Sequence, residues 1–174
     1  MMSLLQRLPL LGLLALGGAC ASAPSPEASN RPAALAGLEY LKELKGRWVV
    51  QSGTEGPLGW EFDVTSRGGV VTERLKMGVE TEMASVYHLL DDELVLAHFC
   101  QLGNQPRLTR TDSELPGDLH FLCDGEVPSA SSHGDLHMHG VHFQRTGDRL
   151  RVWMDMYKDD VFAFETSYEM IRAE

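Results

Sequence analysis

Gly46-Arg47-Trp48 opens the part of the chain that decides the fold, because it joins a short helical pattern to a long series of strand patterns. Before it, leucine recurs at every third position, at Leu35, Leu38, Leu41 and Leu44, which is typical of one face of a helix. Gly46 is a stop signal for that helix. After Trp48 the chain has only strand-like runs separated by turn residues, so the sequence predicts one short N-terminal helix followed by strands.

The predicted strands are short, evenly spaced and not interrupted by helices. Leu90-Asp91-Asp92-Glu93 is typical of a tight hairpin, and Thr146-Gly147-Asp148 and Lys158-Asp159-Asp160 are typical connecting turns. About ten strands without interleaved helices favour an antiparallel sandwich or barrel over a parallel sheet. The expected strands are 48–52, 59–65, 69–77, 82–89, 94–101, 108–112, 118–124, 136–145, 149–157 and 161–172.

The two ends of this series favour a closed barrel. Gly46-Arg47-Trp48 lies on the first strand and Arg172 near the end of the last, an arrangement that resembles the lipocalin and calycin pattern. There, a G-x-W on the first strand packs under an arginine from the last strand. An indole face attracts a guanidinium, and pairing the two strands removes the sheet edges. The resemblance implies an all-β fold, a single antiparallel up-and-down barrel of about 8–10 strands, lipocalin-like, with a short N-terminal helix.

A longer set of segments resembles a second group of proteins. Ser85-Val86-Tyr87-His88-Leu89 is followed by Leu94-Val95-Leu96-Ala97-His98-Phe99-Cys100, by Gly103-Asn104-Gln105-Pro106-Arg107 and later by His137-Met138-His139. These segments are similar to those of a family of uncharacterised bacterial secreted or lipid-anchored lipocalin-like proteins. The resemblance covers roughly residues 41–172. It implies the barrel fold and no particular reaction.

Length and composition exclude several classes of protein. A chain of 174 residues is long enough for one domain. It has 25 acidic and 15 basic residues and a net charge of −10, which opposes general binding to nucleic acid or to anionic membrane surfaces. A hydrophobic content of 43% is ordinary for a globular protein and excludes a fully disordered chain.

The N-terminus has the pattern of a secretory signal peptide. Arg7 precedes an apolar run from Leu8 to Leu16, and small residues follow. The run is too short to cross a bilayer as a helix, which needs about 20 residues. Gly18-Ala19-Cys20 resembles the end of a bacterial lipobox, in which the cysteine becomes the lipidated first residue of the mature chain. Ordinary cleavage after Ala21 or Ala23 is the alternative.

These features divide the chain into a signal peptide over residues 1–19, a flexible tether over 20–33 and a lipocalin-like β-barrel domain over 34–174. The tether is predicted from its Ser, Pro and Ala content. We expect an exported protein, either a periplasmic or outer-membrane lipoprotein or a secreted one. Its membrane contact would be the lipid anchor alone.

The two remaining cysteines, Cys100 and Cys123, lie in predicted strands that are near neighbours along the chain. Outside the cytoplasm, a pair of thiols tends to oxidise where the geometry allows it. The sequence leaves two alternatives, a cross-strand disulfide or two separate buried thiols.

Histidines form the most distinctive polar pattern. His137 and His139 are two residues apart, so they share one face of a strand, and His98 and Cys100 do the same. His88 joins the face of His98 only if the hairpin between them keeps an even register. Imidazoles that converge in a cavity suit Zn, Cu or Fe, so the candidate metal ligands are His98, His137 and His139.

Two other interpretations of the histidines remain open. One histidine could serve as the axial ligand of a haem, since the chain resembles barrels of the nitrobindin type in size and strand number. Alternatively, each histidine could be a hydrogen-bonded structural residue. Possible cofactors are therefore zinc and haem.

The sequence favours a binding protein and has no pattern typical of catalysis, such as a nucleophile elbow or a nucleotide-binding loop. Barrels of this size can enclose one small ligand. We expect a small apolar or amphipathic molecule, with a metal or haem protein and a purely structural envelope module as alternatives. The candidate ligand-binding residues are Tyr87, His88, His98, Asn104, Arg107, His137 and His139.

Overall fold

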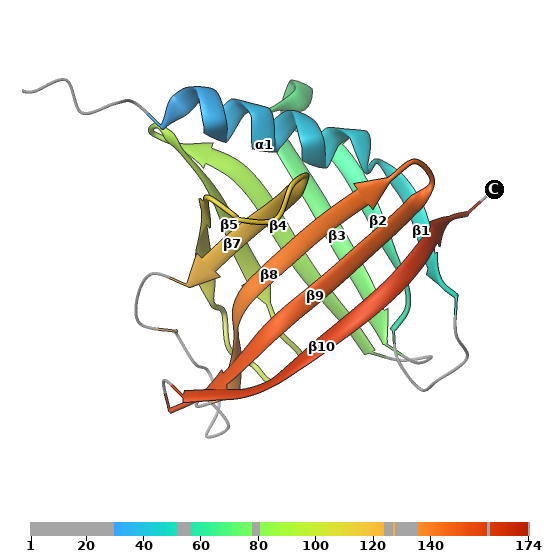
Figure 1. Ribbon diagram of the computed structural model, residues 1–174, viewed down its shortest axis with the longest axis vertical. Coiled ribbons are helices and arrows are strands. Elements are labelled where there is room, and N and C mark those ends of the chain that lie inside the picture. Colours follow the sequence, from blue (N-terminus) through green and yellow to red (C-terminus); the bar gives the residue numbers. More distant parts are fainter. Residues whose placement is uncertain are drawn as a thin grey trace, which may run out of the picture.

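A barrel of ten antiparallel strands makes up most of the chain that the computed structural model describes, which comprises residues 30–51, 57–77, 81–123, 127, 136–159 and 161–173 (Figure 1). Each strand pairs with the next along the chain, and the last pairs with the first. Helix α1 (Arg31–Glu43) precedes them. The strands are β1 (Gly46–Val50), β2 (Pro57–Thr65), β3 (Val70–Met77), β4 (Thr81–Leu90), β5 (Glu93–Phe99), β6 (Arg107–Thr111), β7 (Asp118–Cys123), β8 (Leu136–Thr146), β9 (Arg149–Lys158) and β10 (Val161–Arg172).

The predicted fold class is confirmed, and every predicted strand is present with ends that differ by at most two residues. The tight hairpin is also confirmed, because Leu90 pairs with Glu93 across a two-residue turn. Asp91 in that turn has a φ of 53°, a conformation that the short side chain of Asp tolerates better than most.

The predicted signal peptide, Cys20 and the tether up to residue 29 lie outside the described residues. The tether was expected to reach residue 33, but α1 already begins at Arg31. Pro32 does not prevent this, because the N–H groups in the first turn of a helix have no helical acceptor. A proline there costs no hydrogen bond. Among the described residues, no helix is long and apolar enough to span a membrane.

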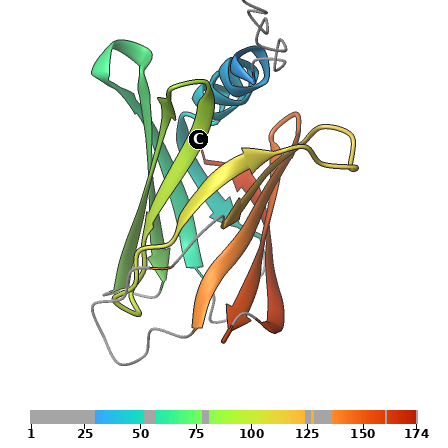
Figure 2. The same cartoon turned by 90° about the vertical axis from the view of Figure 1, so that its left-hand side faces the viewer.

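Helix α1 lies across one end of the barrel (Figures 1 and 2). Three of the four predicted leucines, Leu38, Leu41 and Leu44, are buried, while Leu35 is 40% exposed. The Tyr40 hydroxyl donates a hydrogen bond to the Phe143 carbonyl at 3.0 Å. The apolar face of the helix therefore closes this end of the barrel.

The first and last strands meet as the sequence predicts. Trp48 pairs with Arg172, and the Arg172 guanidinium lies 4.4 Å above the indole. Its nitrogens also donate to the carbonyls of Lys45 at 2.7 Å and Glu43 at 2.9 Å. The Trp48 Nε1–H donates to the Leu44 carbonyl at 2.7 Å. One contact thus closes the sheet and satisfies carbonyls that the end of α1 leaves without helical partners.

The half of the barrel interior next to α1 is filled by side chains. Trp48, Phe62, Phe121 and Phe143 are essentially inaccessible. Phe62 and Phe121 both pack edge-on against Phe143, with ring centres 6.3 and 6.4 Å apart. Space for a ligand is therefore restricted to the other half.

Candidate functional site

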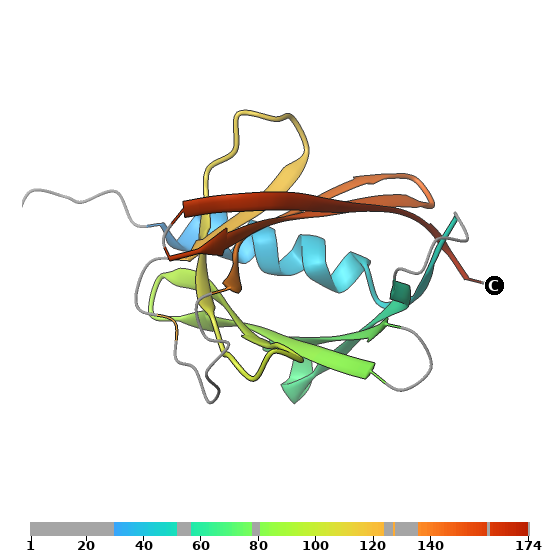
Figure 3. The same cartoon turned by 90° about the horizontal axis from the view of Figure 1, so that it is seen from below.

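An apolar cavity of about 260 Å³ lies at the end of the barrel opposite α1, the end that faces the viewer in Figure 3. It is formed by the end of β3, the start of β4, the residues after β5 and the adjoining parts of β8, β9 and β10. Four methionines supply much of its wall, and methionine side chains adapt to ligands of irregular shape. Its lining includes Met83, Met138, Met154, Met156, His98 and Cys100.

His98 is the buried imidazole of this cavity. The hairpin register pairs His98 with Ser85, and His98 Nδ1 is hydrogen-bonded to Ser85 Oγ at 3.0 Å. Burial lowers the pKa of His98 from 6.5 to about 4, so the ring is neutral at physiological pH. A neutral imidazole can accept or donate one hydrogen bond to a ligand without bringing a charge into an apolar space.

Tyr87 lies deeper in the barrel, between the rings of Phe121 and Phe143. Its hydroxyl donates a short hydrogen bond to the carboxylate of Glu73, which also interacts with Trp60. Burial raises the pKa of Glu73 from 4.5 to about 7, and burial together with Glu73 raises the pKa of Tyr87 well above 10.0. Tyr87 is therefore part of a buried polar network, and it does not line the cavity.

Three other predicted ligand-binding residues lie away from the lining. Asn104 is fully buried, and its Nδ2 donates to the Leu136 carbonyl at 2.7 Å, so it supports the cavity wall from behind. His88 occupies the strand face opposite to that of His98, because the register places Ser85 rather than His88 beside His98. Arg107 is exposed at the start of β6.

The predicted disulfide between Cys100 and Cys123 is not formed. Strand β6 lies between β5 and β7, and two steps of about 4.8 Å across a sheet exceed the Cα separation of a disulfide, which is at most about 7 Å. Cys100 Sγ instead lies 4.0 Å from Met83 Sδ. The alternative of two separate, partly buried thiols is the one observed.

His137, His139 and Cys123 form a second cluster beside the cavity. His137 Nε2 and His139 Nδ1 are 3.3 Å apart, and the ligand atoms of all three residues lie within 4.8 Å of one another. His98, which the sequence grouped with the two histidines, is not part of this cluster. It lines the cavity together with Leu136 and Met138, whereas strand alternation turns the intervening His137 to the other face of β8.

His120 and His142 form a stacked pair on neighbouring strands, with ring centres 3.7 Å apart. His142 Nδ1 is 2.7 Å from the buried carboxylate of Asp118, and its ring stacks on Trp153 at 4.4 Å. Burial, followed by the neighbouring His142, lowers the pKa of His120. His142 is thus a hydrogen-bonded structural histidine, one of the alternatives that the sequence left open, whereas the contact of His120 is the stacking on His142.

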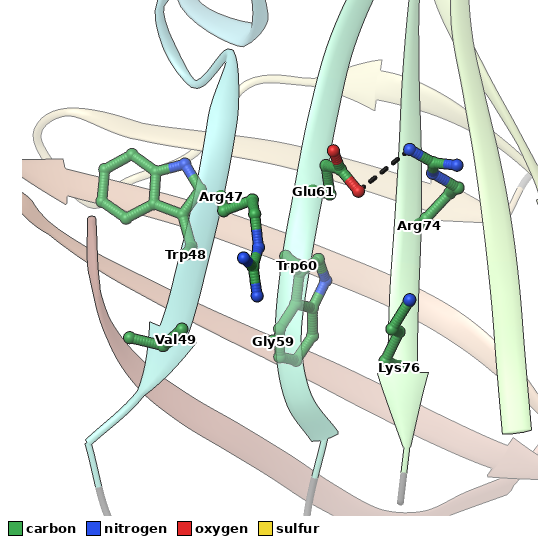
Figure 4. A pocket seen from close by; sticks show the side chains of 8 residues that line it. All are labelled: Arg47, Trp48, Val49, Gly59, Trp60, Glu61, Arg74 and Lys76. Atoms are coloured by element: carbon green, nitrogen blue, oxygen red, sulfur yellow. Dashed lines mark hydrogen bonds and ion pairs between the residues drawn. The ribbon is translucent and has the colours of Figure 1, made fainter. Parts of the chain in front are cut away.

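A groove of about 480 Å³ lies on the outer surface of β1, β2 and β3 (Figure 4). The backbones of β1 and β2 approach closely at Gly59, where a Cβ atom would stand only 2.5 Å from the Trp48 carbonyl oxygen. Arg47, Arg74 and Lys76 project along it, and Arg74 forms an ion pair with Glu61 at 2.9 Å. The groove is polar and solvent-exposed, unlike the apolar interior cavity.

The methionines are the cavity-lining residues that sequence reasoning did not select. Met154 and Met156 alternate along β9, and alternation of this kind marks side chains that share one face of a strand. That signal was present in the sequence. It could not show that this inward face borders empty space rather than packed core.

The cavity volume bears on the haem hypothesis. Small-molecule sites commonly measure about 300–1,000 Å³, and this cavity is just below that range. The volume of the described cavity therefore gives the haem hypothesis no support.

Comparison with known proteins supports the fold alone. The chain matches no protein-family model and no curated protein sequence. Among solved structures it is similar to the crystal structure of Rv2717c from M. tuberculosis, with a TM-score of 0.53 and 16% sequence identity, over 79% of this chain and 98% of that one. At this identity the similarity shows a shared antiparallel barrel and carries no statement about ligands.

Proposed function

We propose that the protein binds a small apolar or amphipathic molecule in the cavity at the end of the barrel opposite α1. The observation that carries the proposal is the lining itself, which combines four methionines with one buried, neutral histidine, His98. Apolar walls with a few placed polar groups are typical of small-molecule sites. A side-chain-filled structural barrel is the competing interpretation.

The lining suggests how such a ligand is oriented. Its apolar body would contact the methionine side chains, including Met154 and Met156, while a hydroxyl, carbonyl or amide group would face His98. His98 is held by Ser85, so its ring direction is set before the ligand arrives. Pre-organisation of this kind reduces the entropy lost on binding.

Filling the cavity is expected to weaken binding. Met154→Trp adds an indole to the lining, so binding of N-phenyl-1-naphthylamine, a small apolar fluorescent probe, should weaken by about tenfold or more, equivalent to at least about 1.4 kcal/mol. Fluorescence titration of the full chain measures the affinity. Phe99→Trp is the matched control, because Phe99 is 46% exposed and is not part of the cavity lining.

A native mass spectrum of the protein purified from its producing cell provides the second readout. A co-purified small molecule that is absent from the Met154→Trp protein would support the proposal. Failure of the wild-type protein both to bind the probe and to carry a small molecule would favour the structural barrel.

We further propose that the barrel is exported and held at the cell envelope by a lipid on Cys20, as in the secreted and lipid-anchored proteins that its segments resemble. Cys20→Ser is expected to move the protein from the membrane fraction to the soluble periplasm or the medium, because the lipobox cysteine is the acylated residue. Cell fractionation with immunoblotting measures this shift.

Cys100→Ser is the matched control for that experiment, since Cys100 lies at the barrel cavity and should leave the fractionation unchanged. A wild-type protein whose mass shows no acyl chains and whose location does not depend on Cys20 would contradict the lipid anchor.

A further inference from the structure

The cluster of Cys123, His137 and His139 lies next to the proposed ligand cavity but is distinct from it. Its residues come from the end of β7 and the start of β8. Only the intervening Met138 lines the cavity. The cluster therefore requires an explanation of its own.

A local irregularity of β8 brings the two imidazoles together. The register with β9 shifts between Met138 and Gly140, which leaves His139 as the extra residue of a bulge. Bulges re-aim a side chain and recur next to functional sites. Here the His139 ring stacks on Tyr157 with centres 4.0 Å apart and turns its Nδ1 toward His137 Nε2.

The two nitrogens form a hydrogen bond in the structure, and their separation also matches that of two ligands of one metal ion. Two nitrogens at a Zn–N distance of about 2.0–2.1 Å and a tetrahedral angle lie about 3.3–3.4 Å apart, and the observed distance is 3.3 Å. A thiolate in the same tetrahedron lies about 3.6 Å from each nitrogen. The Cys123 sulfur is within 4.8 Å of both, so a movement of at most about 1.2 Å completes the set.

We propose that Cys123, His137 and His139 bind one zinc ion through a thiolate and two imidazole nitrogens. Two neutral imidazoles and one thiolate form a borderline-soft set that suits Zn²⁺ and disfavours Ca²⁺ and Mg²⁺, which prefer oxygen. The thiol proton passes to solvent when the metal binds. The described residues supply three ligands, and a tetrahedral zinc site takes a fourth, from water, an added ligand or another part of the chain.

Titration of the metal-free full-length protein with Zn²⁺, in competition with a chromophoric chelator, tests the site. We expect one zinc ion per chain, and no binding of Ca²⁺ or Mg²⁺ under the same conditions. Cys123→Ser and His137→Asn should each weaken zinc binding by at least about a hundredfold, since even residues that only support a metal ligand cost 10–100-fold when removed. His139→Phe should do the same while keeping a ring to stack on Tyr157.

His88→Asn and His142→Asn are the matched controls, because His88 lies on the outer face of β4 and His142 belongs to the pair with His120. Both should bind zinc like the wild-type protein. Zinc affinity that survives Cys123→Ser and His137→Asn, or that is lost in His142→Asn instead, would overturn the proposal.

Cobalt gives a readout on the unmodified protein, which guards against variants that fail to fold. Co²⁺ in this site should show an intense thiolate-to-cobalt charge-transfer band in the near ultraviolet, and the band should persist in Cys100→Ser but disappear in Cys123→Ser. Absence of that band from the wild-type protein at saturating Co²⁺ would contradict the assignment of Cys123 as a ligand.

Discussion

Replacing Trp48 with alanine is expected to lower the free energy of unfolding by about 3–5 kcal/mol, the range for truncation of a large buried aromatic side chain. Trp48 is completely buried. It also joins β1 to two other elements, because its indole contacts the Arg172 guanidinium on β10 and its Nε1–H donates to the Leu44 carbonyl at the end of α1. Urea unfolding of the purified variant measures the loss.

The same contact predicts that Trp48 and Arg172 are energetically coupled. Arg172→Ala alone should cost less, since its side chain is 31% exposed, and a cation–π contact at such a site contributes about 0.5–1 kcal/mol. In a double-mutant cycle the interaction energy should be at least about 0.5 kcal/mol. Trp48→Phe is the milder variant, because it keeps an aromatic face below Arg172 but loses the bond to Leu44. Fully additive effects in both cycles would contradict closure of the barrel through this pair.

The fold was predictable because its signals are local or lie at the two ends of the chain. Strand-like runs between turn residues located the strands, and Leu90-Asp91-Asp92-Glu93 located the hairpin between β4 and β5, while its register was left open and came from the structure. Gly46, Trp48 and Arg172 identified the strands that close the barrel. Each of these features depends on residue types at set spacings, which a sequence displays directly.

The candidate site was predictable only in part. His98 and the pair His137 and His139 were selected because strand alternation places side chains on faces. Cys123 was missed as their neighbour, since the bulge at His139 is a tertiary feature that changes the direction of one side chain. His98 was grouped with them, but it faces the cavity with Met138, while His137 lies on the opposite face of β8, and sequence spacing does not show which of the two faces points inward.

For Glu73, the sequence shows which way the side chain points but not what it contacts. It alternates with Val71 and Leu75, both of which are buried, so the pattern of β3 already pointed its carboxyl group inward. Its partners Tyr87 and Trp60 come from β4 and β2. A buried carboxyl is tolerated only with such partners, and the sequence does not reveal them.

In the wild-type protein, Glu73 is expected to make the free energy of unfolding fall as the pH rises. Glu73→Gln should remove this decrease. Burial raises the pKa of Glu73 from 4.5 to about 7. Between these values the folded protein keeps a proton that the unfolded chain has released, so the free energy of unfolding falls by about 1.4 kcal/mol per pH unit. By pH 7 this contribution is about 3 kcal/mol, and the Gln variant should lack it.

His98→Asn is expected to have the opposite effect on the pH profile. Burial lowers the pKa of His98 from 6.5 to about 4, so the unfolded chain binds a proton in this interval that the folded protein does not bind. The His98 contribution is complete above pH 6.5 and is lost as the pH falls toward 4, again by about 3 kcal/mol. Asn keeps a polar group near Ser85 but does not titrate.

The two variants together make the assignment of both groups testable. Between pH 4.5 and 6.5 the opposing slopes of Glu73 and His98 should nearly cancel in the wild-type protein. Glu73→Gln should therefore gain stability with rising pH, His98→Asn should lose it, and the double variant should again be flat with respect to these two groups. Urea unfolding at half-unit steps from pH 4 to pH 8 measures the four profiles.

Tyr87→Phe removes the hydroxyl that helps to hold the Glu73 carboxylate, so it should move the Glu73 transition to higher pH. Four parallel profiles would show that neither group changes its protonation on unfolding, and the assignments of a protonated Glu73 and a neutral His98 would then be wrong.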